Sequence, residues 1–438
     1  MKNTITLLAA FVLFINKVQS QEINNNSNDS LFKYIIDLRN ELEELKKEKK
    51  VVTTTSVSTS TPTGAVIEKK ANWYDKIQVR GYVQIRYNRL FETNPELKSD
   101  QGDKSIGNFG GFFIRRNRLI LSGQLSDHVY FYIQPDFASS VSTTALHFAQ
   151  IRDAYFDVSL DKNKAFRFRI GQSKVPYGFE NMQSSQNRLP LDRNDALNSA
   201  VSNERDLGVF FYFTPKKVRE LYSSLVSDGL KGSGDYGVLG FGAYNGQTAN
   251  KPETTNGPHL AARLSYPIKI KNQIIEPSVQ AYSGIYKLDQ TTTGVKKNKT
   301  LEYLDERIAG TFVLYPKPFG IQAEYNIGKG PQYDYLLDSI TTKELKGGYV
   351  TISYLIKLKK HILIPFARYT NYEGGKKFEL DARAYKVEEF EGGIEYQPLK
   401  NFEATVSWVH SQKWTSDKAK KDNFQVGSFL RIQCQLNF

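Results

Sequence analysis

Arginine side chains recur on one face of the alternating segments of this chain, where their charge could act on anions. A guanidinium group stays charged at physiological pH and offers forked N–H donors that match phosphate oxygens. The arginines on the polar faces are Arg80, Arg86, Arg116, Arg118, Arg169, Arg263, Arg307 and Arg431. A row of them along one passage would attract anions, provided that each contact is weak enough to release the ion.

A second group of cations lies in residues 174–206, a long polar segment with Lys174, Arg188, Arg193 and Arg205. A loop of roughly thirty residues in a compact protein is usually functional or disordered. We therefore consider this segment a candidate constriction loop. The alternative is a loop that only covers the mouth of the protein.

Acidic residues share the polar faces with these arginines, which allows a purely structural interpretation. These acids are Asp136, Asp153, Asp157, Asp305 and Glu403. Opposite charges across a lumen satisfy one another, so each arginine could serve the fold and not a ligand. Arg116 and Arg118 are the preferred ligand-attracting candidates because they lie two residues apart on one strand.

The elements that must position these residues are long strands. Residues 75–90 alternate strictly between polar and apolar types for more than ten residues, which indicates a long half-buried strand. Sixteen such stretches extend from there to residue 438, and 217–227 could not be assigned. Short turns and longer polar inserts, at 92–111, 246–257, 287–301, 328–344 and 412–423, separate many of them. The pattern predicts an all-β fold, a transmembrane antiparallel β-barrel of about 16 strands. A soluble all-β protein would not need strands longer than the usual five or six residues.

The last strand is the strongest sign of the compartment. Counting back by twos from Phe438 gives Leu436, Cys434, Ile432 and Leu430, whereas Arg431 lies on the polar face between them. An apolar face that ends in a terminal Phe resembles the C-terminal signature of outer-membrane barrels. We therefore expect a protein of the outer membrane of a Gram-negative bacterium, in contact with lipid and lipopolysaccharide. Cys434 is interpreted as a small apolar side chain facing lipid.

The N-terminal region divides into three predicted parts that precede a barrel over residues 73–438. Residues 1–20 have the charged start, short apolar run and small-residue cleavage site of a signal peptide. Residues 21–50 contain apolar positions 31, 35, 38, 42 and 45, a heptad spacing that predicts a short helix and possible coiled coil. The alternative is a lone amphipathic helix. Residues 51–72 are a Thr/Ser-rich linker.

Charge and composition exclude several classes of function. The net charge is +13, of which residues 1–20 contribute +2 and residues 21–50 contribute −1, so +12 lies in the rest. The cations are scattered and carry no nucleic-acid-binding motif, so no nucleic acid partner is expected. The five histidines lie in no recognisable hydrolase motif or metal-ligand spacing. We expect no enzyme, no catalytic residue, no metal and no cofactor; an outer-membrane barrel hydrolase is the remote alternative.

Five motifs in order resemble the phosphate-selective porin O/P family. They are RRNRL at 115–119, QPDFA at 134–138, DAY at 153–155, GQSKVPYG at 171–178 and RDLGV at 205–209. The resemblance implies a sixteen-stranded barrel, a homotrimer, and a third loop folded into the pore. It also implies passive diffusion of small anions such as phosphate through an Arg/Lys-lined lumen, with a general non-selective porin as the alternative.

Overall fold

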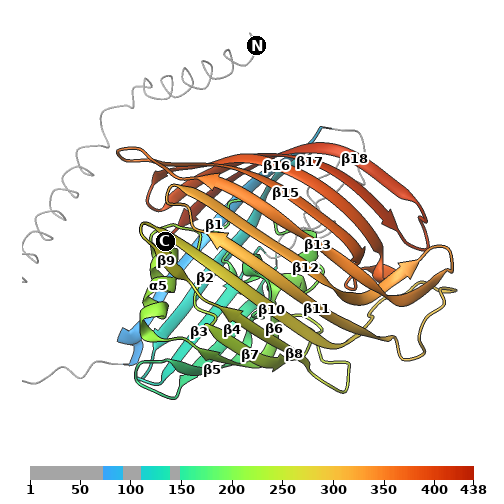
Figure 1. Ribbon diagram of the computed structural model, residues 1–438, viewed down its shortest axis with the longest axis horizontal. Coiled ribbons are helices and arrows are strands. Elements are labelled where there is room, and N and C mark those ends of the chain that lie inside the picture. The colour runs from blue at the N-terminus through green and yellow to red at the C-terminus, as the bar shows by residue number, and fades with distance from the viewer. Residues whose placement is uncertain (1–72, 92–109, 139–147) are drawn as a thin grey trace, which may run out of the picture. The chain divides into compact units, whose positions relative to one another are not determined.

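The chain forms a closed antiparallel β-barrel, which confirms the predicted fold class (Figure 1). The computed structural model describes residues 73–91, 110–138 and 148–438. The ring closes where β1 pairs with β18, from Tyr82 opposite Asn437 to Leu90 opposite Phe429. Closure leaves no free sheet edge, as a strand structure must if it is to satisfy its backbone groups in lipid.

Sixteen spanning strands make up the ring. This number counts β8 and β9 as one strand, because both pair with β10, and β13 and β14 as one strand, because both pair with β15. The bounds of the strands are β1 Ile77–Leu90, β2 Gly111–Gln124, β3 Val129–Asp136, β4 Gln150–Ser159, β5 Phe166–Lys174, β6 Arg205–Phe213, β7 Leu239–Tyr244, β8 His259–Ser265, β9 Ile268–Ile270, β10 Gln273–Lys287, β11 Glu302–Leu314, β12 Phe319–Asp334, β13 Ser339–Tyr354, β14 Ile356–Lys357, β15 Ile362–Gly375, β16 Ala384–Leu399, β17 Phe402–Ser416 and β18 Asn423–Asn437. The helices are η1 Trp73–Lys76, α3 Phe179–Met182, α4 Asp195–Asn198, η2 Ser202–Glu204, α5 Lys216–Ser227 and η3 Leu380–Ala382.

The two faces of each strand differ as a lipid-embedded barrel requires. In β1, Gln84 and Arg86 are completely buried in the lumen, whereas Val79 and Ile85 are exposed on the outside. Because the side-chain period of a strand is two residues, one face points into the interior and the other lies on the outside. Cys434 is exposed on the outer face, as its place in the alternation predicts.

The connections differ in length between the two ends of the barrel. Short connections define what we call the turn end, among them residues 125–128, 160–165, 315–318 and 400–401. Longer connections lie at the opposite end, which we call the loop end, among them residues 175–204, 245–258, 288–301 and 376–383. One connection at the turn end breaks this rule: residues 214–238 between β6 and β7 contain α5, so the unassigned stretch 217–227 is a helix.

The predicted polar insert at 328–344 was wrong. β12 and β13 pair without interruption from Phe319 opposite Tyr354 to Asp334 opposite Ser339, and only a short turn joins them. The outward positions near this turn are charged, among them Lys329 and Glu344. These outward charges interrupt the apolar face that marks a strand in sequence, although the backbone pairing continues.

The terminal residue closes the barrel at the turn end. The backbone N–H of Gly81 donates to the carbonyl oxygen of Phe438 at 2.8 Å, and the N–H of Phe438 donates back at 3.0 Å. A Cβ at position 81 would lie 2.6 Å from the Phe438 ring, so glycine is required for this approach.

The predicted signal peptide 1–20, helix 21–50 and linker 51–72 lie outside the described residues and stay predictions. In the part of the chain that the structure describes, none of the helices combines the length and the apolar character needed to cross a membrane.

Candidate functional site

The long connection between β5 and β6, residues 175–204, folds into the lumen and touches distant parts of the wall. The Ser185 hydroxyl lies 2.7 Å from the Tyr82 hydroxyl on β1. The Phe179 N–H donates to Glu324 on β12 at 2.6 Å, and the Tyr177 hydroxyl donates to Asn326 on the same strand. We call residues 175–204 the inward loop, because these contacts place it inside the lumen.

Apolar packing holds one side of the inward loop against the wall. Val175, Tyr177 and Leu197 are fully buried and form a cluster with lumen residues such as Phe210 and Tyr282. The rings of Tyr177 and Tyr282 meet edge to face at 4.8 Å, a favourable aromatic geometry. The loop is therefore a packed part of the barrel interior.

Asp192 carries the first of two charged anchors of the inward loop. Its carboxylate accepts both hydrogen bonds of an Arg86 guanidinium nitrogen, at 3.0 and 3.1 Å. It lies 3.1 Å from Arg431 and 3.7 Å from Arg115. Burial would raise the pKa of Asp192, but Arg86, Arg431 and Arg115 hold the pKa well below its usual range. Asp192 is thus ionised and binds the loop to β1, β2 and β18.

Glu204 carries the second anchor, where the loop returns to the wall. It lies 2.6 Å from Arg205, 3.1 Å from Arg193, 3.5 Å from Lys174 and 3.6 Å from Arg188. Burial opposes ionisation, yet these four cations keep the pKa of Glu204 well below its usual range. All four predicted constriction-loop residues therefore gather at one carboxylate, with Lys174 and Arg205 at the ends of β5 and β6.

Further polar contacts tie the loop to the strands opposite. These are Glu180 with Arg368 at 3.0 Å, Asp195 with Lys376 at 2.5 Å, and the Arg307 guanidinium donating to the Ala196 carbonyl at 2.8 Å.

Most of the arginines predicted to face the lumen do so, and they are paired with acids. Arg118 lies 2.8 Å from Asp136, Arg169 2.8 Å from Asp157, and Arg263 2.9 Å from Glu276. Their guanidinium charge is neutralised locally, which supports the structural interpretation for these residues. Arg80 differs: it is exposed near the turn end, with its guanidinium 6.0 Å from the centre of the Tyr132 ring.

Arg116 and Arg188 are two buried arginines with guanidinium nitrogens that make no hydrogen bond in the described structure. Arg116 is 5% exposed, donates to Gln84 at 2.7 Å, and has no ion pair within 4.0 Å among the described residues. Arg188 is 4% exposed, and none of its three guanidinium nitrogens has a hydrogen-bond partner in the described structure. The two side chains interact electrostatically with each other. Two buried guanidinium groups that retain unused donors are an arrangement that an anion would stabilise.

Two β-bulges turn further arginines toward the lumen, which the two-residue alternation of the sequence did not predict. The register of β1 with β2 passes from Gln84 opposite Arg116 to Ile85 opposite Ile114, so Arg115 is the extra residue. The register of β3 with β4 skips Arg152 in the same way. A bulge redirects one side chain, which explains why Arg115 reaches Asp192 and why Arg152 lies 3.7 Å from Asp136. Only the doubled arginine at 115–116 hints at this in the sequence.

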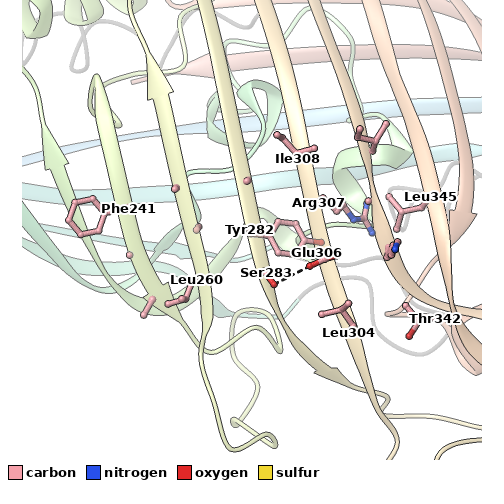
Figure 2. Close-up of a pocket in the computed structure, with 18 of the residues that line it drawn as sticks. Phe241, Leu260, Tyr282, Ser283, Leu304, Glu306, Arg307, Ile308, Thr342 and Leu345 are labelled. Atoms are coloured by element: carbon pink, nitrogen blue, oxygen red, sulfur yellow. Dashed lines mark hydrogen bonds between the residues drawn. The ribbon is translucent and has the colours of Figure 1, made fainter.

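A surface hollow lies on the outer wall of the barrel. Figure 2 shows it over β7, β8, β11 and β13, where outward side chains such as Phe241, Leu260 and Ile308 line it. Its polar end includes Glu306, which faces Lys329 across β11 and β12 and accepts a hydrogen bond from Ser283. Arg307, which contacts the inward loop, is also among the residues that line this hollow.

The sequence and the structure were compared with those of known proteins. No curated protein matches the chain. The structure resembles the outer membrane channel DcaP of Acinetobacter baumannii, with a TM-score of 0.54 and 16% identity over 83% of this chain and 97% of that one. It also resembles an anion-selective porin from Comamonas acidovorans (TM-score 0.50, 11% identity, 83% and 99% covered) and OprB of Pseudomonas putida (TM-score 0.50, 7% identity, 83% and 94% covered). These likenesses concern the fold. The family of phosphate-selective porins O and P matches residues 91–438, and the chain belongs to this family.

Proposed function

We propose that this protein is an outer-membrane porin through which small anions such as phosphate diffuse passively, and that Arg116 and Arg188 attract them at the inward loop. The carrying observation is that these two buried guanidinium groups keep donors free of protein partners. Other lumen arginines, among them Arg118, Arg169 and Arg263, donate hydrogen bonds to an acid. Family membership indicates a channel and not an enzyme.

Replacement of each arginine by glutamine tests this function. Arg116→Gln and Arg188→Gln should lower the anion-to-cation permeability ratio, measured as the reversal potential of purified protein in planar bilayers under a KCl gradient. Phosphate should also block the KCl current less well, by roughly ten- to a hundredfold for the loss of one hydrogen bond to a charged group. Arg80→Gln is the matched control, because it removes the same charge from an exposed arginine near the turn end.

Two outcomes would decide against the proposal. A cation-selective reversal potential for the unaltered protein would refute anion diffusion. Equal phosphate block in all three variants would show that Arg116 and Arg188 do not attract phosphate.

We also propose export through a cleaved signal peptide, lipid and lipopolysaccharide contact, and a homotrimer helped by the predicted helix at 31–45. N-terminal sequencing of the mature protein should start at Gln21. Deletion of residues 21–50 should lower the temperature at which the oligomer dissociates in detergent; an unchanged temperature would remove the helix from this account.

A further inference from the structure

The connection between β6 and β7 is unusual for its end of the barrel. Residues 214–238 lie at the turn end, where strands are otherwise joined by only a few residues. Figure 1 shows α5 at the same end as the C-terminus. Long connections in compact proteins generally have a function of their own, and here the geometry shows where this one goes.

The apolar face of α5 is buried inside the barrel. Val218, Tyr222 and Leu225 form a cluster with lumen residues of distant strands, among them Val313 on β11 and Ile364 on β15. Those lumen positions are apolar where most of the lumen is polar. Because apolar side chains facing a water-filled pore would be unfavourable, this wall patch requires a cover, and α5 supplies it.

The segment then reaches the far wall. The Lys231 ammonium donates to both oxygens of Glu395 on β16, at 2.6 and 2.8 Å. Around the ring, β16 lies seven strands from β7 in one direction and eight from β6 in the other. The contact therefore spans the lumen. Glu395 is 1% exposed and Lys231 8%, so the ion pair is largely shielded from solvent.

The base of the segment is held separately from its tip. Asp235 lies 2.5 Å from Arg167 on β5 and 3.2 Å from Arg219 on α5, and it accepts a hydrogen bond from Thr214. Between this base and α5, Lys231 has a φ of 65°, a left-handed conformation that costs a side-chain-bearing residue about 1 kcal/mol or more.

The tip also meets the inward loop, since the Gln183 side chain donates to the Lys231 carbonyl at 2.6 Å. We propose that residues 214–238 form a second constriction, in series with the inward loop, which Lys231 and Glu395 latch across the turn end and which sets the largest solute that passes. This proposal rests on the protein being a channel, and it does not depend on which ion the channel prefers.

A charge-neutral double variant tests the latch. Lys231→Gln with Glu395→Gln removes the ion pair without changing the net charge of the lumen. We expect roughly a doubling of single-channel conductance, since one of two constrictions in series is relieved. Swelling of proteoliposomes should also show entry of neutral oligosaccharides that the unaltered protein excludes. The matched control is Lys251→Gln with Asp289→Gln, which removes an exposed ion pair at the loop end.

A second variant acts on the helix itself. Leu225→Arg places a charge in the apolar cluster and should displace α5, while the strands stay intact by circular dichroism and by heat-dependent mobility in SDS gels. Unchanged conductance and an unchanged oligosaccharide limit in both folded variants would overturn the proposal. The reversal potential measures anion preference independently of these size measurements. A cation-selective channel whose variants admit larger oligosaccharides would therefore refute the proposed function and still support the second constriction.

Discussion

Asp192 offers the sharpest test of how the inward loop is held. Its carboxylate is the shared partner of Arg86, Arg431 and Arg115, and all four side chains are largely buried. Asp192→Asn keeps the size of the side chain and removes its charge. Guanidinium groups on three strands then face one another without the acid that separates them.

The expected magnitude follows from the burial of this cluster. Removing one partner of a buried ion pair costs roughly 3–5 kcal/mol, because the remaining charge is left uncompensated. Since about 1.4 kcal/mol corresponds to a tenfold change in an equilibrium constant, the population of detached loop should rise by roughly a hundredfold to three-thousandfold. Glu180 and Glu204 still hold the loop elsewhere, so the upper figure is a limit.

Limited proteolysis measures this population directly. Trypsin requires access to Arg188 or Arg193, which are 4% and 9% exposed in the docked loop. When opening is fast relative to cleavage, the cleavage rate follows the open population. Mass spectrometry should therefore show faster cutting at these two residues in Asp192→Asn. The reversal potential should shift toward greater anion preference, because the constriction loses a negative charge.

The control is Asp127→Asn, which removes the same charge from an exposed turn. Asp127→Asn should leave the cleavage rate unchanged. If Asp192→Asn is cleaved at Arg188 and Arg193 at a rate within twofold of the unaltered protein, and its reversal potential is unchanged, Asp192 does not hold the loop.

Three further outcomes are expected. Burial lowers the pKa of Lys377 to about 8, so the lumen should lose a positive charge as the pH rises through 8. The anion-to-cation permeability ratio of the unaltered protein should therefore fall around pH 8. The ratio of Lys377→Arg should not change, because arginine stays protonated. Gly246→Ala should sharply reduce the yield of folded barrel on SDS gels, because its Cβ would lie 1.8 Å from the buried His259 ring, whereas Gly294→Ala, at a similar positive φ in open space, should not; equal yields would contradict this. Deletion of Phe438 removes two hydrogen bonds that close the barrel and should lower its thermal unfolding temperature in detergent, and an unchanged temperature would count against this role.

Strand structure and the direction of most side chains could be predicted from sequence. Arg86 and Arg431 face the lumen and Cys434 faces outward, as counting by twos indicated. The same count failed at 328–344, where charged residues such as Lys329 and Glu344 interrupt the apolar face, and at Arg115 and Arg152, where bulges interrupt the period. It also did not distinguish Arg116 from Arg118, of which only Arg118 has an acid partner.

The sequence by itself determined the architecture, because lipid outside and water inside impose a two-residue period that is visible residue by residue. Only the tertiary structure decided which charges remain available in the lumen. Asp192 and Glu204 lie in a loop with no such period, and they meet their arginines only when the closed ring brings distant strands around that loop. The crossing from Lys231 to Glu395 has the same origin, since residues 164 positions apart become neighbours only across a closed barrel.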